Sequence, residues 1–123
     1  MEQTREEEFW NTLTHFIGLI ASIAGISFLL YFNNTLPILS LTGVLFFGFG
    51  LVSVYLSSTL YHYVSEPVLK EKLRIFDHIS IYYLILGSYA PVCLITLLNM
   101  SGLYIFAIVS LIALFGTFFK LFY

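Results

Sequence analysis

A few polar side chains fall at helical spacings in a sequence that is otherwise mostly apolar, and their types suit hydrolytic chemistry. Ser58 and His62 are four positions apart, which places both on one face of a helix. Neutral imidazole is a common zinc ligand, and zinc lowers the pKa of a bound water to about 7. A carboxylate such as that of Asp77 orients such a water or takes its proton. These residue types therefore suggest a metal-assisted hydrolytic site.

Each of these polar residues also has a purely structural interpretation. His15 can hydrogen-bond to a neighbouring helix, as buried polar groups in membrane helices do. Asp77 follows Arg74 closely and can serve as the N-cap carboxylate of a helix. Ser58 can donate a hydrogen bond to the carbonyl group of Val54. The spacing alone leaves both interpretations open.

The elements that position these residues follow from composition. The chain has 123 residues, of which 59% are hydrophobic and 10% are charged, and no Asp, Glu, Lys or Arg occurs at positions 9–65 or 78–119. An ordinary soluble domain has about 25% charged residues, so that class is excluded. Each uncharged stretch is long enough for two membrane spans of about 20 residues. The net charge of −2 leaves no basic stripe, which argues against nucleic-acid binding.

The pattern predicts an all-α integral membrane bundle of four transmembrane helices. The expected helices cover about 11–32, 38–64, 75–98 and 103–122 within one transmembrane domain, 1–123. The first ten residues are expected to form a polar lead-in. Pro91 lacks a backbone donor and predicts a kink in the third helix. Small residues at four-residue spacing predict close helix packing; the pairs are Ala21 with Gly25 and Ser53 with Ser57.

All the basic residues lie on one predicted side of the membrane: Arg5, Lys70, Lys72, Arg74 and Lys120. Because cytoplasmic loops are enriched in Lys and Arg, we expect both termini to be cytoplasmic in a protein of the cell membrane. The candidate site residues then lie near the cytoplasmic face, on three consecutive helices. We therefore expect them to meet in one polar pocket there.

Three segments of the sequence resemble a known family in their order, spacing and placement on successive helices. They are Asn11-x-x-Thr14-His15-x-x-Gly18, Ser57-Ser58-Thr59-Leu60-Tyr61-His62, and Asp77-His78-x-x-Ile81-Tyr82 with Gly87-Ser88-Tyr89-x-Pro91. In these features the chain is similar to the hemolysin III family, which belongs with the progestin and adipoQ receptors. The resemblance covers essentially the whole chain and about the first half of a typical member.

The resemblance implies a seven-helix, adiponectin-receptor-like membrane fold with a zinc site near the cytoplasmic face. In that family the site combines an S-x-x-x-H pair, an aspartate of the third helix and an H-x-x-x-H pair on the last helix. Carried over, His62 is a metal ligand, Asp77 holds the metal-bound water, and Ser58 supports the site. His15 and His78 match family positions without being zinc ligands, and with Asn11 they are expected to support the pocket.

The resemblance also indicates an incomplete copy, because this sequence contains no H-x-x-x-H pair. Two functions follow from it. The first is a zinc-dependent hydrolase of lipid amide or ester bonds, acting on membrane lipid and completed by a C-terminal half from elsewhere. The alternative is a channel-forming cytolysin that assembles as a homo-oligomer in the membrane.

Overall fold

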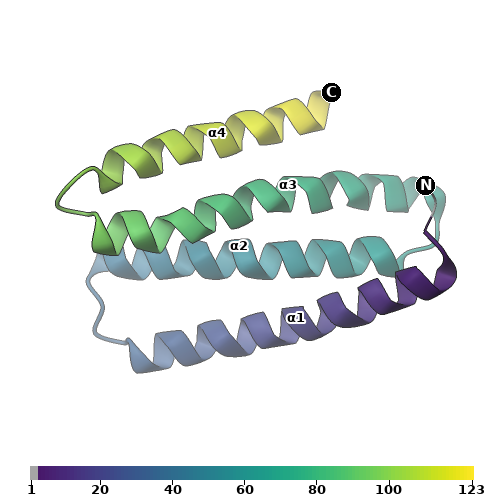
Figure 1. Ribbon diagram of the computed structural model, residues 1–123, viewed down its shortest axis with the longest axis horizontal. Coiled ribbons are helices and arrows are strands. Elements are labelled where there is room, and N and C mark those ends of the chain that lie inside the picture. The colour runs from purple at the N-terminus through teal and green to yellow at the C-terminus, as the bar shows by residue number, and fades with distance from the viewer. Residues whose placement is uncertain (1–2) are drawn as a thin grey trace.

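The chain folds into four long helices joined by short connections. The computed structural model describes residues 3–123, so Met1 and Glu2 of the predicted lead-in lie outside the described residues. The long helices are α1 (Arg5–Phe32), α2 (Ile38–Tyr63), α3 (Pro67–Pro91) and α4 (Gly102–Phe122), and a short π-helix, η1 (Val92–Thr96), continues α3 (Figure 1). The four helices, α3 together with η1, are long and apolar enough to cross a membrane. The predicted all-α, multi-pass membrane fold is thus confirmed.

The helices pack in the order in which they follow one another along the chain. Consecutive helices run antiparallel, with α1 against α2, α2 against α3, and α3 against α4 (Figure 1). Within residues 3–123, no close backbone approach joins α1 to α3 or to α4, or joins α2 to α4. The bundle is therefore an open row, and α2 with α3 forms its centre.

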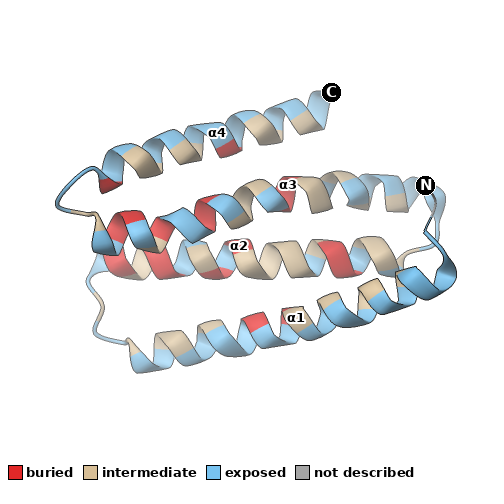
Figure 2. Cartoon of the chain, in the orientation of Figure 1, coloured by how far each residue is buried: buried red, intermediate tan, exposed pale blue. Residues whose placement is uncertain are grey.

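The buried side chains concentrate on these two central helices (Figure 2). Val44, Ile79, Leu86 and Ala90 are buried on α2 and α3, whereas α1 buries only Leu19 and Ser22 among its described residues. The outer helices expose large apolar side chains to their surroundings. Lipid is itself apolar, so this exposure costs little in a membrane.

Glycines allow the backbones of α2 and α3 to approach closely. The glycines at this contact are Gly43, Gly50 and Gly87. A Cβ atom added at Gly87 would lie 2.6 Å from the carbonyl oxygen of Phe46. The pair Ala21 and Gly25, which the sequence predicted to pack closely, is exposed instead, and nothing lies within 4 Å of a Cβ added at Gly25. The close approach of two backbones thus lies between α2 and α3, whereas on α1 it is Gly18 that packs closely, against the Tyr55 side chain of α2.

Helix α1 begins at Arg5, earlier than the predicted start near Asn11, because Thr4 caps it. The Glu7 N–H donates to the Thr4 hydroxyl at 3.2 Å, and the Thr4 N–H donates to the Glu7 carboxylate at 2.7 Å. This reciprocal capping box satisfies backbone donors that a helix start leaves free. The described part of the predicted lead-in is therefore mostly the first turns of α1.

Helix α3 likewise begins early, at Pro67 instead of near Ile75, because Glu66 caps it. The Glu66 carboxylate accepts hydrogen bonds from the backbone N–H groups of Val68 at 2.9 Å and Leu69 at 2.7 Å. These hydrogen bonds, that from Val68 first, hold the pKa of Glu66 below its usual value. The N-cap interpretation of Asp77 is wrong, since Asp77 lies well inside this helix.

The far end of α3 shows how the chain accommodates Pro91. Proline has no N–H to donate and its ring clashes with the preceding turn, so the regular α-helix ends at Pro91. It continues as η1, in which the Leu97 N–H donates to the Val92 carbonyl oxygen at 2.9 Å. The predicted kink takes the form of this π-helix, and the span ends at Thr96 instead of Leu98.

Candidate functional site

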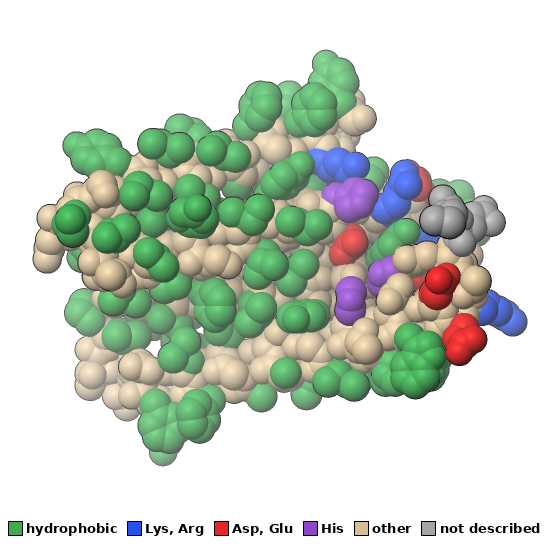
Figure 3. Space-filling model, in the orientation of Figure 1, with side chains coloured by type: hydrophobic (Ala, Val, Ile, Leu, Met, Phe, Trp, Pro, Cys, Tyr) green, Lys and Arg blue, Asp and Glu red, His purple; other side chains and the backbone are tan. Residues whose placement is uncertain are grey.

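The histidines and the charged side chains gather at one end of the bundle, where α1 and α3 begin and α2 and α4 end (Figure 3). We call this the polar end; from the distribution of basic residues it is predicted to be the cytoplasmic end. The rest of the visible surface is largely apolar. Ionisable groups are costly to bury in a membrane, so their collection in one place suggests a site.

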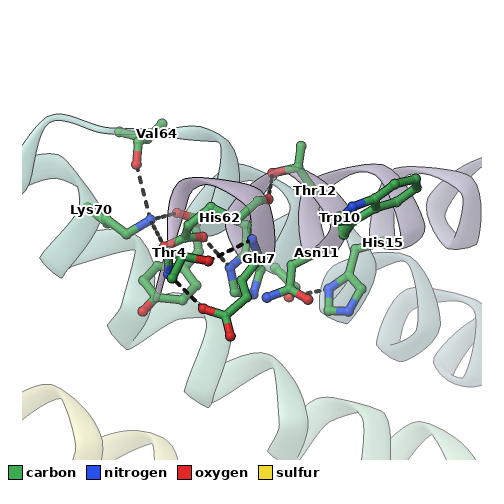
Figure 4. A network of polar contacts seen from close by, with 12 residues as sticks. Thr4, Glu7, Trp10, Asn11, Thr12, His15, His62, Val64 and Lys70 are labelled. Carbon is green, nitrogen blue, oxygen red and sulfur yellow. Dashed lines mark hydrogen bonds and ion pairs between the residues drawn. The ribbon is translucent and has the colours of Figure 1, made fainter. Parts of the chain in front are cut away.

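Glu8 of α1 joins three helices at the polar end through His62 and Lys70, the two partners labelled in Figure 4. Its Oε2 atom lies 2.7 Å from Nδ1 of His62 on α2, and its Oε1 atom lies 2.8 Å from Nζ of Lys70 on α3. The His62 side chain is only 9% exposed, whereas that of Glu8 is 21% exposed. The carboxylate therefore holds a largely buried imidazole in a fixed orientation.

Lys70 completes this cluster by capping the end of α2. Its ammonium group donates to the carbonyl oxygens of Tyr61 at 2.9 Å and Val64 at 3.3 Å, and it lies 4.7 Å from the centre of the Tyr61 ring. The carbonyl groups at a helix C-terminus carry partial negative charge and attract a cation. Lys70 thus binds the end of α2 to both α1 and α3.

His15 and Ser58 form a second link between α1 and α2. The His15 Nδ1 atom lies 2.5 Å from the hydroxyl oxygen of Ser58, which is buried. The His15 and His62 rings meet edge to face with their centres 5.6 Å apart. The Val54 carbonyl, suggested above as the acceptor for Ser58, instead accepts from Ser57 at 3.3 Å. Ser58 thus links α2 to α1 through His15.

Asp77 lies on α3 at a depth between those of Ser57 and His62. The Ser57 hydroxyl donates to the Ser80 hydroxyl at 2.9 Å, and Ser80 donates to the backbone carbonyl of Asp77 at 2.6 Å. At a rise of about 1.5 Å per residue, Asp77 lies about 4.5 Å from Ser80 along α3, toward the polar end. His62 lies about 7.5 Å from Ser57 along α2, toward the same end. The Asp77 carboxylate is half-buried, and within residues 3–123 it makes no hydrogen bond or ion pair.

Two predicted supporting residues contribute less. Asn11 and His78 are both half-buried near the polar end. In the described part of the chain, neither side chain forms a hydrogen bond with another site residue. Of the predicted site residues, those brought into direct contact are His15 with Ser58 and His15 with His62, and His62 also contacts Glu8.

The sequence prediction missed Glu8 and Lys70. A signal for Glu8 was present, because Glu8 and His15 are seven positions apart and therefore share one face of a helix. It went unused because the first helix was expected to begin near Asn11. Lys70 was placed in a connection, whereas it lies in the first turns of α3.

The described residues do not by themselves form a complete zinc site. A catalytic zinc takes three protein ligands and keeps one position for water. Within residues 3–123, no group of three or more His, Cys, Asp or Glu side chains is arranged to hold a metal ion. One feature does suit a metal ligand: a carboxylate holds Nδ1 of His62, as such partners hold ligating histidines in metal sites.

An apolar groove of about 590 Å³ runs between α2, α3 and α4. Its walls include Phe49, Leu60 and Phe76, and the hydroxyl groups of Ser57 and Ser80 also line it. Because Ser80 is bonded to the Asp77 carbonyl, the groove lies beside the helical turn that carries Asp77. The apolar groove thus lies next to the polar end.

The sequence is similar to a protein family and to two of its relatives over nearly its whole length. Residues 3–123 match the protein family described as "Haemolysin-III related". The "Hemolysin-3 homolog" of Bacillus subtilis (strain 168) is 39% identical over 124 residues, which cover 98% of this chain and 57% of the relative. "Hemolysin-3" of Bacillus cereus is 36% identical over 124 residues, which cover 100% of this chain and 57% of the relative.

The chain thus spans 57% of the length of these curated relatives. No solved structure matches it. The family match extends over the helices that carry His15, His62 and Asp77, and it agrees with the helical, membrane-spanning fold. This multi-pass membrane protein belongs to the Haemolysin-III related family.

Proposed function

We propose that this chain forms one part of a membrane-embedded hydrolytic site that cleaves lipid amide or ester bonds. The observation that carries this proposal is the placement of His62, Ser58 and Asp77 at one end of the bundle, on helices held together there by polar contacts. Buried polar groups in membrane helices are expensive, and a hydrolytic site is a use that requires them.

Asp77 acts as the general base in this proposal. Its carboxylate is half-buried and has no hydrogen-bond or ion-pair partner within residues 3–123, so it is available to orient a water and take its proton. The contact between His15 and Ser58 holds α1 against α2. His62 presents its Nε2 atom, because Glu8 occupies its Nδ1 atom.

Zinc binding is a separate part of the proposal and requires more than this chain's described residues. His62 supplies one candidate ligand with a carboxylate partner, and the remaining ligands come from outside residues 3–123. A complementing segment of the family is the source that we propose. Zinc held there would supply an activated water for attack on a carbonyl group.

The groove between α2, α3 and α4 supports a lipid as substrate. Its lining is mostly apolar and it lies among membrane-spanning helices, which suits an acyl chain. Ser57 and Ser80 line the groove, and the Ser80 hydroxyl donates to the backbone carbonyl of Asp77. A bond next to the acyl chain is then within reach of the polar end.

A channel-forming cytolysin is the alternative, as the name Hemolysin-3 suggests for the Bacillus cereus relative. A water-filled pore needs polar groups along the whole span. The charged and histidine side chains instead gather at one end (Figure 3), an arrangement that favours a site at one membrane face.

The test is hydrolysis of a fluorescent long-chain lipid amide and ester in vesicles that hold the chain. The chain is assayed alone and together with the segment of the Bacillus subtilis relative that lies beyond the matched region. We expect cleavage with stoichiometric zinc in the combined sample, and a loss of about 100-fold or more in Asp77→Asn.

Glu71→Gln is the matched control, because Glu71 is exposed and pairs only with Arg74 among the described residues. It is expected to keep full activity. Absence of both zinc and lipid cleavage in the combined sample, with the protein inserted and helical, would reject the hydrolytic proposal. Release of a trapped dye from the same vesicles would favour the cytolysin.

A further inference from the structure

We infer that Glu8 is a positioning residue: its carboxylate fixes the proton of the His62 imidazole on Nδ1, so that Nε2 carries the free lone pair. The functional consequence rests on the proposed role of His62, whereas the position of the proton does not. The inference assigns a role to the first turns of α1, which the sequence prediction treated as a polar lead-in.

The contact itself determines which ring nitrogen carries the proton. An ionised carboxylate only accepts hydrogen bonds, and the Glu8 Oε2 atom lies 2.7 Å from His62 Nδ1. Nδ1 must therefore donate. In a neutral imidazole the other nitrogen, Nε2, is then unprotonated and able to bind a metal or accept a proton.

Lys70 keeps the Glu8 carboxylate in this role. Its ammonium group lies 2.8 Å from Oε1, the oxygen that His62 does not use. The ammonium group and the carboxylate form an ion pair, in which Glu8 accepts the hydrogen bond. Two further hydrogen bonds, to the carbonyls of Tyr61 and Val64, fix Lys70 on the same turn of α2 that carries His62. Glu8 is thus held from both sides.

His15 offers an internal comparison. Its Nδ1 atom faces the Ser58 hydroxyl, which can donate or accept a hydrogen bond. This contact is compatible with either tautomer. The two imidazoles lie edge to face, yet only His62 has a partner that dictates its tautomer. The difference between them follows from Glu8.

The experiment is ¹⁵N nuclear magnetic resonance of the histidine rings in the whole chain, embedded in lipid bilayers, with the imidazoles neutral. Protonated and unprotonated ring nitrogens have distinct signals, and His15→Gln and His78→Gln assign those of His62. We expect His62 to be protonated on Nδ1. In Glu8→Gln the ratio of the two tautomers should move toward Nε2–H by about tenfold, as expected on losing a charge-assisted hydrogen bond.

Glu6→Gln is the control, because Glu6 is exposed in the same first turns of α1. It should leave the His62 signals unchanged. A proton on Nε2 of His62 in the unaltered chain overturns the inference without any variant. So does an unchanged tautomer ratio in Glu8→Gln.

Two further readouts keep the interpretation unambiguous. If Glu8→Gln does not insert and fold, magnetisation transfer from the Glu8 carboxyl carbon to a protonated His62 Nδ1 in the unaltered chain supports the inference, and its absence rejects it. Loss of lipid cleavage in Asp77→Asn with no tautomer change in Glu8→Gln would reject the inference and leave the proposed function standing. Unchanged lipid cleavage in Asp77→Asn, together with a tautomer change in Glu8→Gln, would reject only the proposed function.

Discussion

Replacing Gly87 with alanine places a methyl group where α3 packs against the backbone of α2. The added Cβ atom would lie 2.6 Å from the carbonyl oxygen of Phe46 and 3.2 Å from the Cα atom of Phe47. Real Cβ contacts essentially never fall below 3.0 Å. Both neighbouring atoms belong to the backbone, so neither can rotate away. The two helices must therefore move apart by several tenths of an ångström.

The cost of this separation follows from close packing. A gap of about 0.5 Å forfeits about a quarter of the dispersion energy between facing atoms. Overpacking a well-packed core typically costs about 1–3 kcal/mol, and the better helix propensity of alanine returns up to about 1 kcal/mol of it. We expect Gly87→Ala to lower the free energy of unfolding by about 1–2 kcal/mol.

The assay is equilibrium unfolding in mixed micelles with a rising fraction of denaturing detergent, followed by circular dichroism. Gly25→Ala is the matched control, because nothing lies within 4 Å of a Cβ atom added there. It should be as stable as the unaltered chain or slightly more stable. If Gly87→Ala unfolds at the same detergent fraction as Gly25→Ala, the close contact between α2 and α3 is refuted.

Two further predictions use other contacts. Ser58→Ala removes the hydroxyl beside His15 Nδ1 and should lower the free energy of unfolding by about 1 kcal/mol in the same assay. Ser88→Ala is the control and should cost little, because Ser88 is exposed and bonds only to the Leu84 carbonyl of its own helix. Equal losses in the two variants would contradict the Ser58 contact. The lowered pKa of Glu66 predicts a pH dependence. Its stabilisation of the α3 start is complete above the carboxyl pKa of the unfolded chain and is lost as pH falls through the lower folded value. Glu66→Gln should abolish this change in amide-exchange protection at Val68 and Leu69, and a persisting pH dependence would show another cause.

The four spans could be predicted because each depends on a long apolar run, which needs no knowledge of tertiary contacts. The meeting of His15 with Ser58 was foreseeable for a similar reason. Helical spacing puts polar residues on one face, and burial in lipid makes them seek partners on adjacent helices. The sequence therefore indicated at which end of the bundle the polar side chains of these helices gather.

Helix ends and long-range partners were harder to predict. The starts at Arg5 and Pro67 depend on caps from Thr4 and Glu66, and these capping groups lie in charged segments that look like connections. The partner of His62 lies 54 positions away in the sequence. Nothing in the local pattern near His62 indicates that pairing, which requires knowing that α1 begins early.

The packing surfaces also depended on tertiary structure. Spacing favoured Ala21 with Gly25, yet the close approach occurs at Gly87 and other glycines of α2 and α3. Small residues permit close packing, but they do not determine which helix packs against them. The same limit explains Asn11 and His78, which match polar positions but make no side-chain hydrogen bond with other site residues in the described chain.

Three helices bring their polar side chains together at one end of the bundle. A side-chain correlation spectrum of the isotope-labelled chain in lipid bilayers, recorded by solid-state magnetic resonance, measures this arrangement. We expect through-space contacts between Glu8 and His62, between His15 and His62, and between Ser57 and Ser80. If these side chains instead show contacts only to water and lipid headgroups, the helices do not build a common site and the account is wrong.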